Sequence, residues 1–172
     1  MRRFIISASV LSADMGCLAR ESSAVLQAGA DQLHIDVMDN HFVPNLTFGP
    51  LICRALRKHL PNVFLDVHLM VNPVDALISA FAAAGANQMT FHPEASNDIV
   101  KNLNQIRRLG CKAGLAINPQ TELTLLNNYW DHLDFVGLDA TDYKRIGEEL
   151  SQFYLGIINN LIRIEEIDGI KH

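Results

Sequence analysis

Two apolar segments carry residues that bind metals and transfer protons at alternating positions. His34 and Asp36 lie in "LHIDVMDN", and Asp66 and His68 lie in "LDVHLMV". Alternate residues of a strand share one face, so each pair points to one side of its segment. Buried charges are costly unless they are paired or bound to a metal, and imidazole and carboxylate ligands suit zinc, iron(II), manganese or cobalt better than calcium. Two interpretations stay open: a divalent-metal site, or histidines that are hydrogen-bonded core residues.

A methionine extends each of these faces by one more step. Met38 comes two residues after Asp36, and Met70 comes two residues after His68. Methionine is a common filler of gaps in cores, but a pair at equivalent positions also suits an apolar wall over a reacting carbon. The residue types alone do not decide between these two roles.

Two further segments show polar residues with the same alternation. Ser7 and Ser9 of "SASVLSAD" share a face, and so do His92 and Glu94 of "TFHPEA". We expect His92 and Glu94 to form a supporting shell around the histidines and the carboxylate.

Short β-rich segments alternate with helical patterns along the chain. Their starts are 21 to 31 residues apart, which is the spacing of repeated βα units and predicts a parallel sheet. A helix is expected over residues 14–28, ending at Gly29 in a left-handed cap. Polar residues and prolines follow the strands, where parallel α/β folds bind their ligands. The expected strands are 4–9, 32–38, 63–70, 86–91, 112–117 and 133–138.

Composition bounds the class of protein. The chain has 172 residues, 49% of them hydrophobic, and this predicts a single domain over residues 1–172. A net charge of −5 without a Lys/Arg-rich run argues against nucleic acid or a membrane as partner.

We expect the start, "MRRFIISASV", to be a first strand rather than a secretory signal. Three cysteines without a CxxC pair favour a reducing cytosol.

Five motifs occur in the order found in one enzyme family. They are "SASVLSAD", "LHIDVMDNHFVPNLTFGP", "LDVHLMV", "TFHPEA" and "KAGLAINPQT", and they span residues 1 to about 136. Together they closely resemble ribulose-phosphate 3-epimerase. The resemblance implies a (β/α)8 TIM-type barrel, of which six to seven βα units fit in this chain. It also implies one divalent metal ion, a sugar-phosphate substrate and a cytoplasmic role in the pentose phosphate pathway.

The resemblance also implies roles for individual residues. His34, Asp36 and His68 resemble the metal ligands, and Asp36 resembles one of two acid/base carboxylates. Ser9 and His68 are similar to substrate contacts, and Met38 and Met70 to the apolar wall around the reacting centre. Inverting C3 of D-ribulose 5-phosphate to give D-xylulose 5-phosphate needs a proton donor or acceptor on each side, with an enediolate between the two steps. We expect an apolar environment to bring the pKa of Asp36 closer to this task.

Residues 137–172 diverge from the family. The expected glycine-rich phosphate loop is replaced by "GLDATDYKRIGEE", which begins at Gly137. Near the end, "IRIEEIDGIKH" resembles the family segment that carries the second catalytic carboxylate and fourth metal ligand, so Asp168 is the candidate for both roles. A surface position for Asp168 is the alternative.

Three functions therefore stay open for this chain. The first is metal-dependent 3-epimerisation of a pentulose 5-phosphate. The second is a catalytically silent, truncated chain that binds metal or a partner subunit, and association into a homo-oligomer is expected from apolar sheet faces. The third is an epimerase for allulose or allulose 6-phosphate. The orotidine-phosphate decarboxylase relatives are disfavoured because the Asp-x-Lys-x-x-Asp array is absent.

Overall fold

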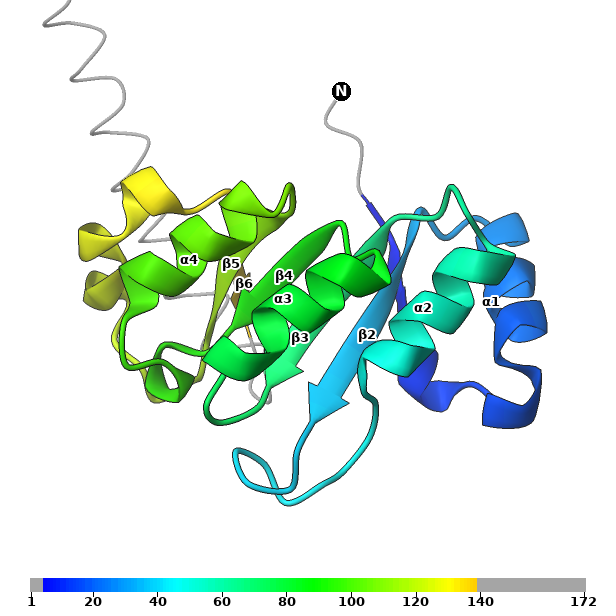
Figure 1. The fold of residues 1–172 in the computed structure, drawn as a ribbon, viewed down its shortest axis with the longest axis horizontal. Coiled ribbons are helices and arrows are strands. Elements are labelled where there is room, and N and C mark those ends of the chain that lie inside the picture. The colour runs from blue at the N-terminus through cyan, green and yellow to red at the C-terminus, as the bar shows by residue number, and fades with distance from the viewer. Residues whose placement is uncertain (1–4, 139–172) are drawn as a thin grey trace, which may run out of the picture. The chain divides into compact units, whose positions relative to one another are not determined.

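Six strands in sequence order form one sheet in the computed structural model of the chain, which describes residues 5–138 (Figure 1). Residues 5–117 and 121–137 belong to one compact unit, to which the sheet and site described below belong, whereas residues 118–120 and 138 group with a second unit. The strands are parallel, as the βα spacing predicts. They are β1 (Ser7–Ser9), β2 (Gln32–Met38), β3 (Leu65–Met70), β4 (Gln88–Phe91), β5 (Lys112–Ile117) and β6 (Phe135–Leu138).

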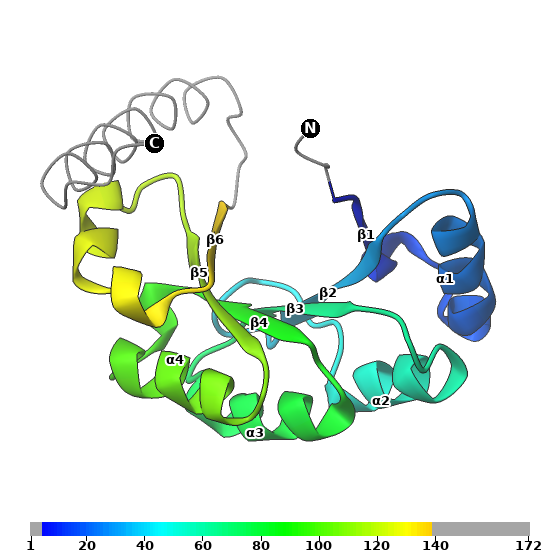
Figure 2. The ribbon, with the colours of Figure 1, turned by 90° about the horizontal axis from the view of Figure 1, so that it is seen from above.

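Helices follow the strands and cover the outer face of the curved sheet (Figure 2). The α-helices are α1 (Leu18–Gln27), α2 (Pro50–His59), α3 (Asp75–Ala84) and α4 (Ile99–Arg108). Short 3₁₀ helices are η1 (Val10–Ser12), η2 (Met15–Cys17), η3 (Pro93–Ala95), η4 (Leu123–Asn128) and η5 (Trp130–His132). Among the described residues, no helix is long and apolar enough to cross a bilayer.

The alternation in β2 decides which face is core. Leu33, Ile35 and Val37 are at most 2% exposed, and they pack on the side of the helices. Leu56 of α2 and Phe81 of α3 are equally buried and complete this outer core. The polar residues of β2 are therefore left on the inner, concave face of the sheet. Six parallel strands curled into a half-barrel confirm the predicted incomplete (β/α)8 fold.

Arg57 of α2 fixes the start of β3, the strand that carries Asp66 and His68. Its guanidinium donates hydrogen bonds to the carbonyl oxygens of Pro61, Val63 and Gly85. The same group also donates to the Asn87 side chain, whose oxygen in turn accepts from the Leu65 amide. One side chain thus satisfies the backbone groups at the entrance to two neighbouring strands.

Several elements begin later than predicted: β3, β4 and β6 each start two residues after the expected position, and the first helix and β1 are also shorter. Within the expected helix 14–28, Asp14 caps the 3₁₀ turn Met15–Cys17, and the α-helix begins only at Leu18. Gly29 has a φ of 116°, which confirms the left-handed helix end. The sheet ladder of β1 begins at Ser7, and the preceding Ile5 and Ile6 are exposed. The Ile6 backbone bonds to Asp31 and Gln32 rather than extending the strand.

Candidate metal and proton-transfer site

The register of β2 and β3 places the predicted site residues side by side. His34 is paired with Asp66, and Asp36 is paired with His68, on adjacent parallel strands. Met38 and Met70 are paired one step further on, at the carboxyl ends of the same strands. Because paired residues of parallel strands point to the same face, the two histidines and the carboxylates meet on the inner face. The expected convergence of the two segments is confirmed.

His34, Asp36 and His68 form a group that could hold a metal ion. One ligand atom from each lies within 4.8 Å of the others. His34 Nε2 is 3.1 Å from Asp36 Oδ1, and His68 Nδ1 is 3.7 Å from the same oxygen. Two imidazoles and a carboxylate fit a zinc, iron(II), manganese or cobalt centre, because these ions accept nitrogen and oxygen ligands together. Asp168, the predicted fourth ligand, lies outside the described residues.

Each histidine has an outer partner on its other ring nitrogen. His34 Nδ1 is 2.7 Å from Asp66 Oδ2, which also accepts a hydrogen bond from Ser7 Oγ. His68 Nε2 is 2.9 Å from His92 Nε2. The contact of His92 confirms its expected supporting position, whereas Glu94 is exposed and accepts a hydrogen bond from Thr121. Asp66 shares a face with His68 in the sequence, but only the register shows that it contacts His34.

Ser9 and Thr47 fix Asp36 from two sides. Ser9 Oγ donates a 2.7 Å hydrogen bond to Asp36 Oδ2 and accepts one from the Leu11 amide. Thr47 Oγ1 donates to the Asp36 carbonyl oxygen at 2.6 Å and accepts from the Met38 amide at 3.0 Å. Sequence reasoning missed Thr47, because a threonine in the segment after a strand has no recognisable signal. The backbone and the carboxylate of Asp36 are therefore both held in place.

The two charged groups of the site stabilise each other. Burial disfavours a charged imidazole, but hydrogen bonds and charge interactions with Asp36 and Asp66 outweigh it and raise the pKa of His34 to about 10. Burial alone would raise the pKa of Asp36, but hydrogen bonds from His34 and Ser9, together with the His68 imidazole 3.7 Å away, outweigh it and lower the pKa. The expectation that an apolar environment brings the pKa of Asp36 closer to its proton-transfer task is therefore wrong, because these polar contacts are stronger than the effect of burial. Asp36 is thus a carboxylate at neutral pH, and a cation bound to His34 would displace a proton.

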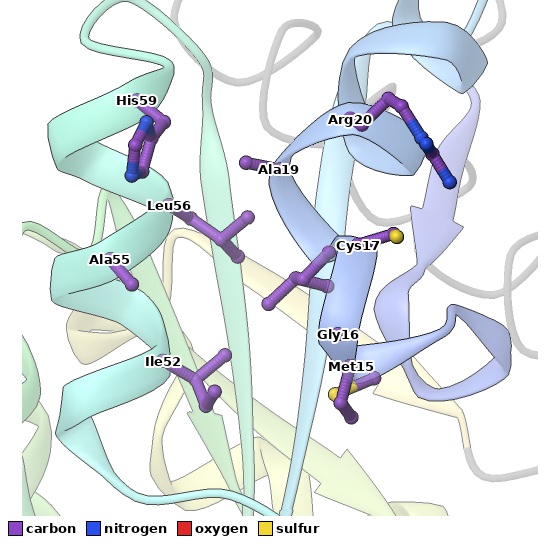
Figure 3. Close-up of a pocket in the computed structure, with 10 residues that line it drawn as sticks. Met15, Gly16, Cys17, Ala19, Arg20, Ile52, Ala55, Leu56 and His59 are labelled. Atoms are coloured by element: carbon purple, nitrogen blue, oxygen red, sulfur yellow. The ribbon is translucent and has the colours of Figure 1, made fainter.

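A groove on the outer side of the sheet is separate from this site. It lies between α1 and α2, has a volume of about 430 Å³, and is lined mainly by apolar side chains such as Leu18, Ile52 and Leu56 (Figure 3). Arg20 and His59 lie near one end of it. None of the residues that the sequence predicts for the site is among those that line this groove.

Comparison with known proteins agrees with the five motifs. The profile of the Ribulose-phosphate 3 epimerase family matches residues 5–163. The chain belongs to the ribulose-phosphate 3-epimerase family. It is 51% identical to ribulose-phosphate 3-epimerase of Buchnera aphidicola subsp. Schizaphis graminum, over 98% of this chain and 78% of that one. It is 48% identical to the Serratia marcescens epimerase, over 97% of this chain and 78% of the relative.

The extent of the match differs between relatives of this family. The chain is 49% identical to the epimerase of Escherichia coli strain K12, over 79% of this chain and 60% of the relative.

Among solved structures, the tryptophan synthase alpha chain of Legionella pneumophila has a TM-score of 0.62 at 13% identity, over 88% of this chain and 67% of that chain. At such low identity, the structural likeness supports the fold alone.

Proposed function

We propose that this chain is a metal-dependent epimerase that interconverts D-ribulose 5-phosphate and D-xylulose 5-phosphate at C3. The observation that carries the proposal is the convergence of His34, Asp36 and His68 within 4.8 Å, in a chain of the ribulose-phosphate 3-epimerase family. We place this activity in the pentose phosphate pathway of the cytoplasm, with a homo-oligomer as the working assembly.

Asp36 is the proposed acid/base group on one side of the sugar. It is ionised, its Oδ2 is held by Ser9, and its Oδ1 faces both histidines, so it can accept the C3 proton without first changing its own position. Asp168 is the proposed carboxylate on the opposite side, on the strength of its Asp-Gly motif. A proton removed on one face and returned on the other inverts the carbon.

His34, Asp36, His68 and Asp168 are the proposed ligands of one divalent ion. When bound, such an ion supplies Lewis-acid stabilisation for the negative charge that develops on the sugar oxygens. Ser9 and His68 are proposed to contact the sugar at the inner face. Met38 and Met70, paired beyond Asp36 and His68, are proposed to exclude water from the reacting carbon.

A coupled assay with D-ribulose 5-phosphate tests this function. The wild-type chain is assayed with zinc, iron(II), manganese and cobalt in turn, beside Asp36→Asn. Replacing a positioned acid/base group should reduce turnover by about 10²–10⁴-fold. Asp131→Asn, a change at an exposed position of η5, is the matched control and should retain wild-type turnover.

The outcomes separate the open alternatives. Equal rates for the wild type and Asp36→Asn would reject catalysis by Asp36. A chain that binds metal but does not turn over D-ribulose 5-phosphate with any of the four metals would favour the silent alternative. Faster turnover of allulose or its 6-phosphate in the same assay would replace the pentulose as substrate. Asp168→Asn should match the loss in Asp36→Asn, and wild-type activity would remove Asp168 from the mechanism.

A further inference from the structure

His92 is a fully buried histidine whose ring adjoins the proposed centre. It follows β4 directly, it is 0% exposed, and its ring centroid lies 5.0 Å from that of His68. The ring is also in contact with Phe42, at 4.9 Å between centroids. Phe42 comes from the segment after β2 and His68 from β3, so His92 packs against two separate parts of the chain.

The contact between the two imidazoles requires that one of the two facing nitrogens, and only one, carries a proton. His68 Nε2 and His92 Nε2 are 2.9 Å apart, a normal hydrogen-bond distance, and a neutral imidazole carries its proton on only one of its two nitrogens. Either His68 donates through Nε2, or His92 does. Which histidine donates determines whether a proton is present on His68 Nδ1, the nitrogen that faces Asp36.

Only one of these arrangements allows His68 to bind a cation. When His68 donates through Nε2, its Nδ1 has a free lone pair directed at the site. When His92 donates instead, the neutral His68 carries its proton on Nδ1 and has no lone pair for a metal. The hydrogen bond on the far nitrogen of a ligating histidine commonly fixes the tautomer and orientation in this way.

We propose that His92 is a positioning residue for the metal centre, and that it acts by accepting the His68 Nε2 proton. His92 then carries its own proton on Nδ1. This role rests on the proposed metal centre. It means that the two histidines of the centre are held by different kinds of hydrogen-bond acceptor. Asp66 supports His34 with a negative charge, whereas His92 supports His68 with a neutral acceptor.

Zinc binding by paired variants tests the acceptor role. Glutamine can place an amide oxygen near the position of histidine Nε2, so His92→Gln retains an acceptor, whereas His92→Leu has none. Isothermal titration with zinc should show wild-type and His92→Gln affinities within about threefold. His92→Leu should bind about 10–100-fold more weakly, the range found for lost partners of metal ligands. Asn102→Leu, a buried polar-to-apolar change on α4, is the control and should bind zinc like the wild type.

Nitrogen-15 NMR of the zinc-loaded wild-type chain provides a readout that does not require a folded variant. It should show the proton of His68 on Nε2 and that of His92 on Nδ1.

A His92 proton on Nε2 would overturn the proposal, and so would equal zinc affinity in His92→Leu and the wild type. Equal losses in His92→Gln and His92→Leu would also overturn it, because the acceptor would then be irrelevant. A wild-type chain that binds no zinc would instead remove the metal centre on which this role rests.

Discussion

The two histidines of the site differ in their surroundings despite equivalent positions on neighbouring strands. His34 lies between two carboxylates, Asp36 and Asp66, which together raise its pKa despite burial. His68 has one carboxylate on its inner nitrogen and an imidazole on its outer nitrogen. A carboxylate behind an imidazole increases the basicity of the ligating nitrogen. We therefore expect His34 to be the more strongly supported ligand of the two.

Substitution of Asp66 tests this difference. Asp66→Asn retains an oxygen that can accept from His34 Nδ1 but removes the charge, so metal affinity should fall about 10-fold. Asp66→Leu removes the acceptor as well, and affinity should fall about 100-fold. Equilibrium dialysis with zinc measures both. Unchanged affinity in Asp66→Leu would show that the 2.7 Å contact with His34 has no part in metal binding.

At the scale of elements, the segment that follows β2 is attached to the end of β3 by one carboxylate. Asp39 Oδ1 accepts hydrogen bonds from the His41 and Phe42 amides, and Oδ2 accepts one from the Asn72 amide, each at 2.8 Å. Asn40 adopts a φ of 61°, which allows the chain to turn at this point. Asp39 thus positions the segment that places Phe42 on His92.

The same three bonds predict a pH dependence of stability. Burial raises the pKa of Asp39, but the backbone hydrogen bonds from Asn72, Phe42 and His41 together outweigh it and lower the pKa below 3.8. A lowered folded-state pKa contributes stability above the unfolded value, and this is lost as pH falls through the folded value. At pH 7, Asp39→Asn should reduce the free energy of unfolding by about 0.5–1.5 kcal/mol, because its amide cannot accept from Asn72 as Oδ2 does and the bond is exposed to solvent.

Urea denaturation at pH 7 and pH 3 checks the sign of this effect. The difference between the wild type and Asp39→Asn should shrink at pH 3, which lies below the ordinary pKa of 3.8, so that the carboxyl of the unfolded wild-type chain gains a proton there. Asp131→Asn, at an exposed position, should show little difference at either pH. A difference for Asp39→Asn that is as large at pH 3 as at pH 7 would contradict the assignment.

At the scale of the main unit, the site residues come from segments far apart in the chain. His34 and His92 are brought together only when β2, β3 and β4 pair in order. A cation that binds this arrangement binds the native state and not the unfolded chain, so it stabilises folding by mass action. Zinc at 100 times its Kd should add about 2.7 kcal/mol, which corresponds to a rise in Tm of about 5–10 °C.

Thermal unfolding followed by circular dichroism measures this shift. The wild type is compared in excess zinc and in a chelator, beside the double variant His34→Gln, His68→Gln, which lacks both imidazole ligands. The variant should unfold at the same temperature in both solutions. A wild-type Tm that does not respond to zinc would contradict a native-state metal site.

Local rules explain why much of this molecule is predictable. Strict alternation in residues 33–38 separates Leu33, Ile35 and Val37 from His34 and Asp36, and a parallel sheet buries the first set under helices. The order of strands follows from the βα repeat, and Gly29 ends its helix because a left-handed residue is needed there. The sequence by itself thus determined the fold class, the inner face and the convergence of His34, Asp36 and His68. Asp168 and the single-domain organisation of residues 1–172 stay predictions.

Tertiary structure alone decided how these three side chains are held in place. Alternation specifies the face of a residue but not its partner on the next strand, so the pairing of His34 with Asp66 required the register. Thr47 contacts Asp36 and Phe42 contacts His92 because a non-repetitive segment returns to the sheet, and no periodicity describes such a path. The pKa of Asp36 likewise depends on whether burial or hydrogen bonding is stronger, and this is fixed by distances of a few ångströms.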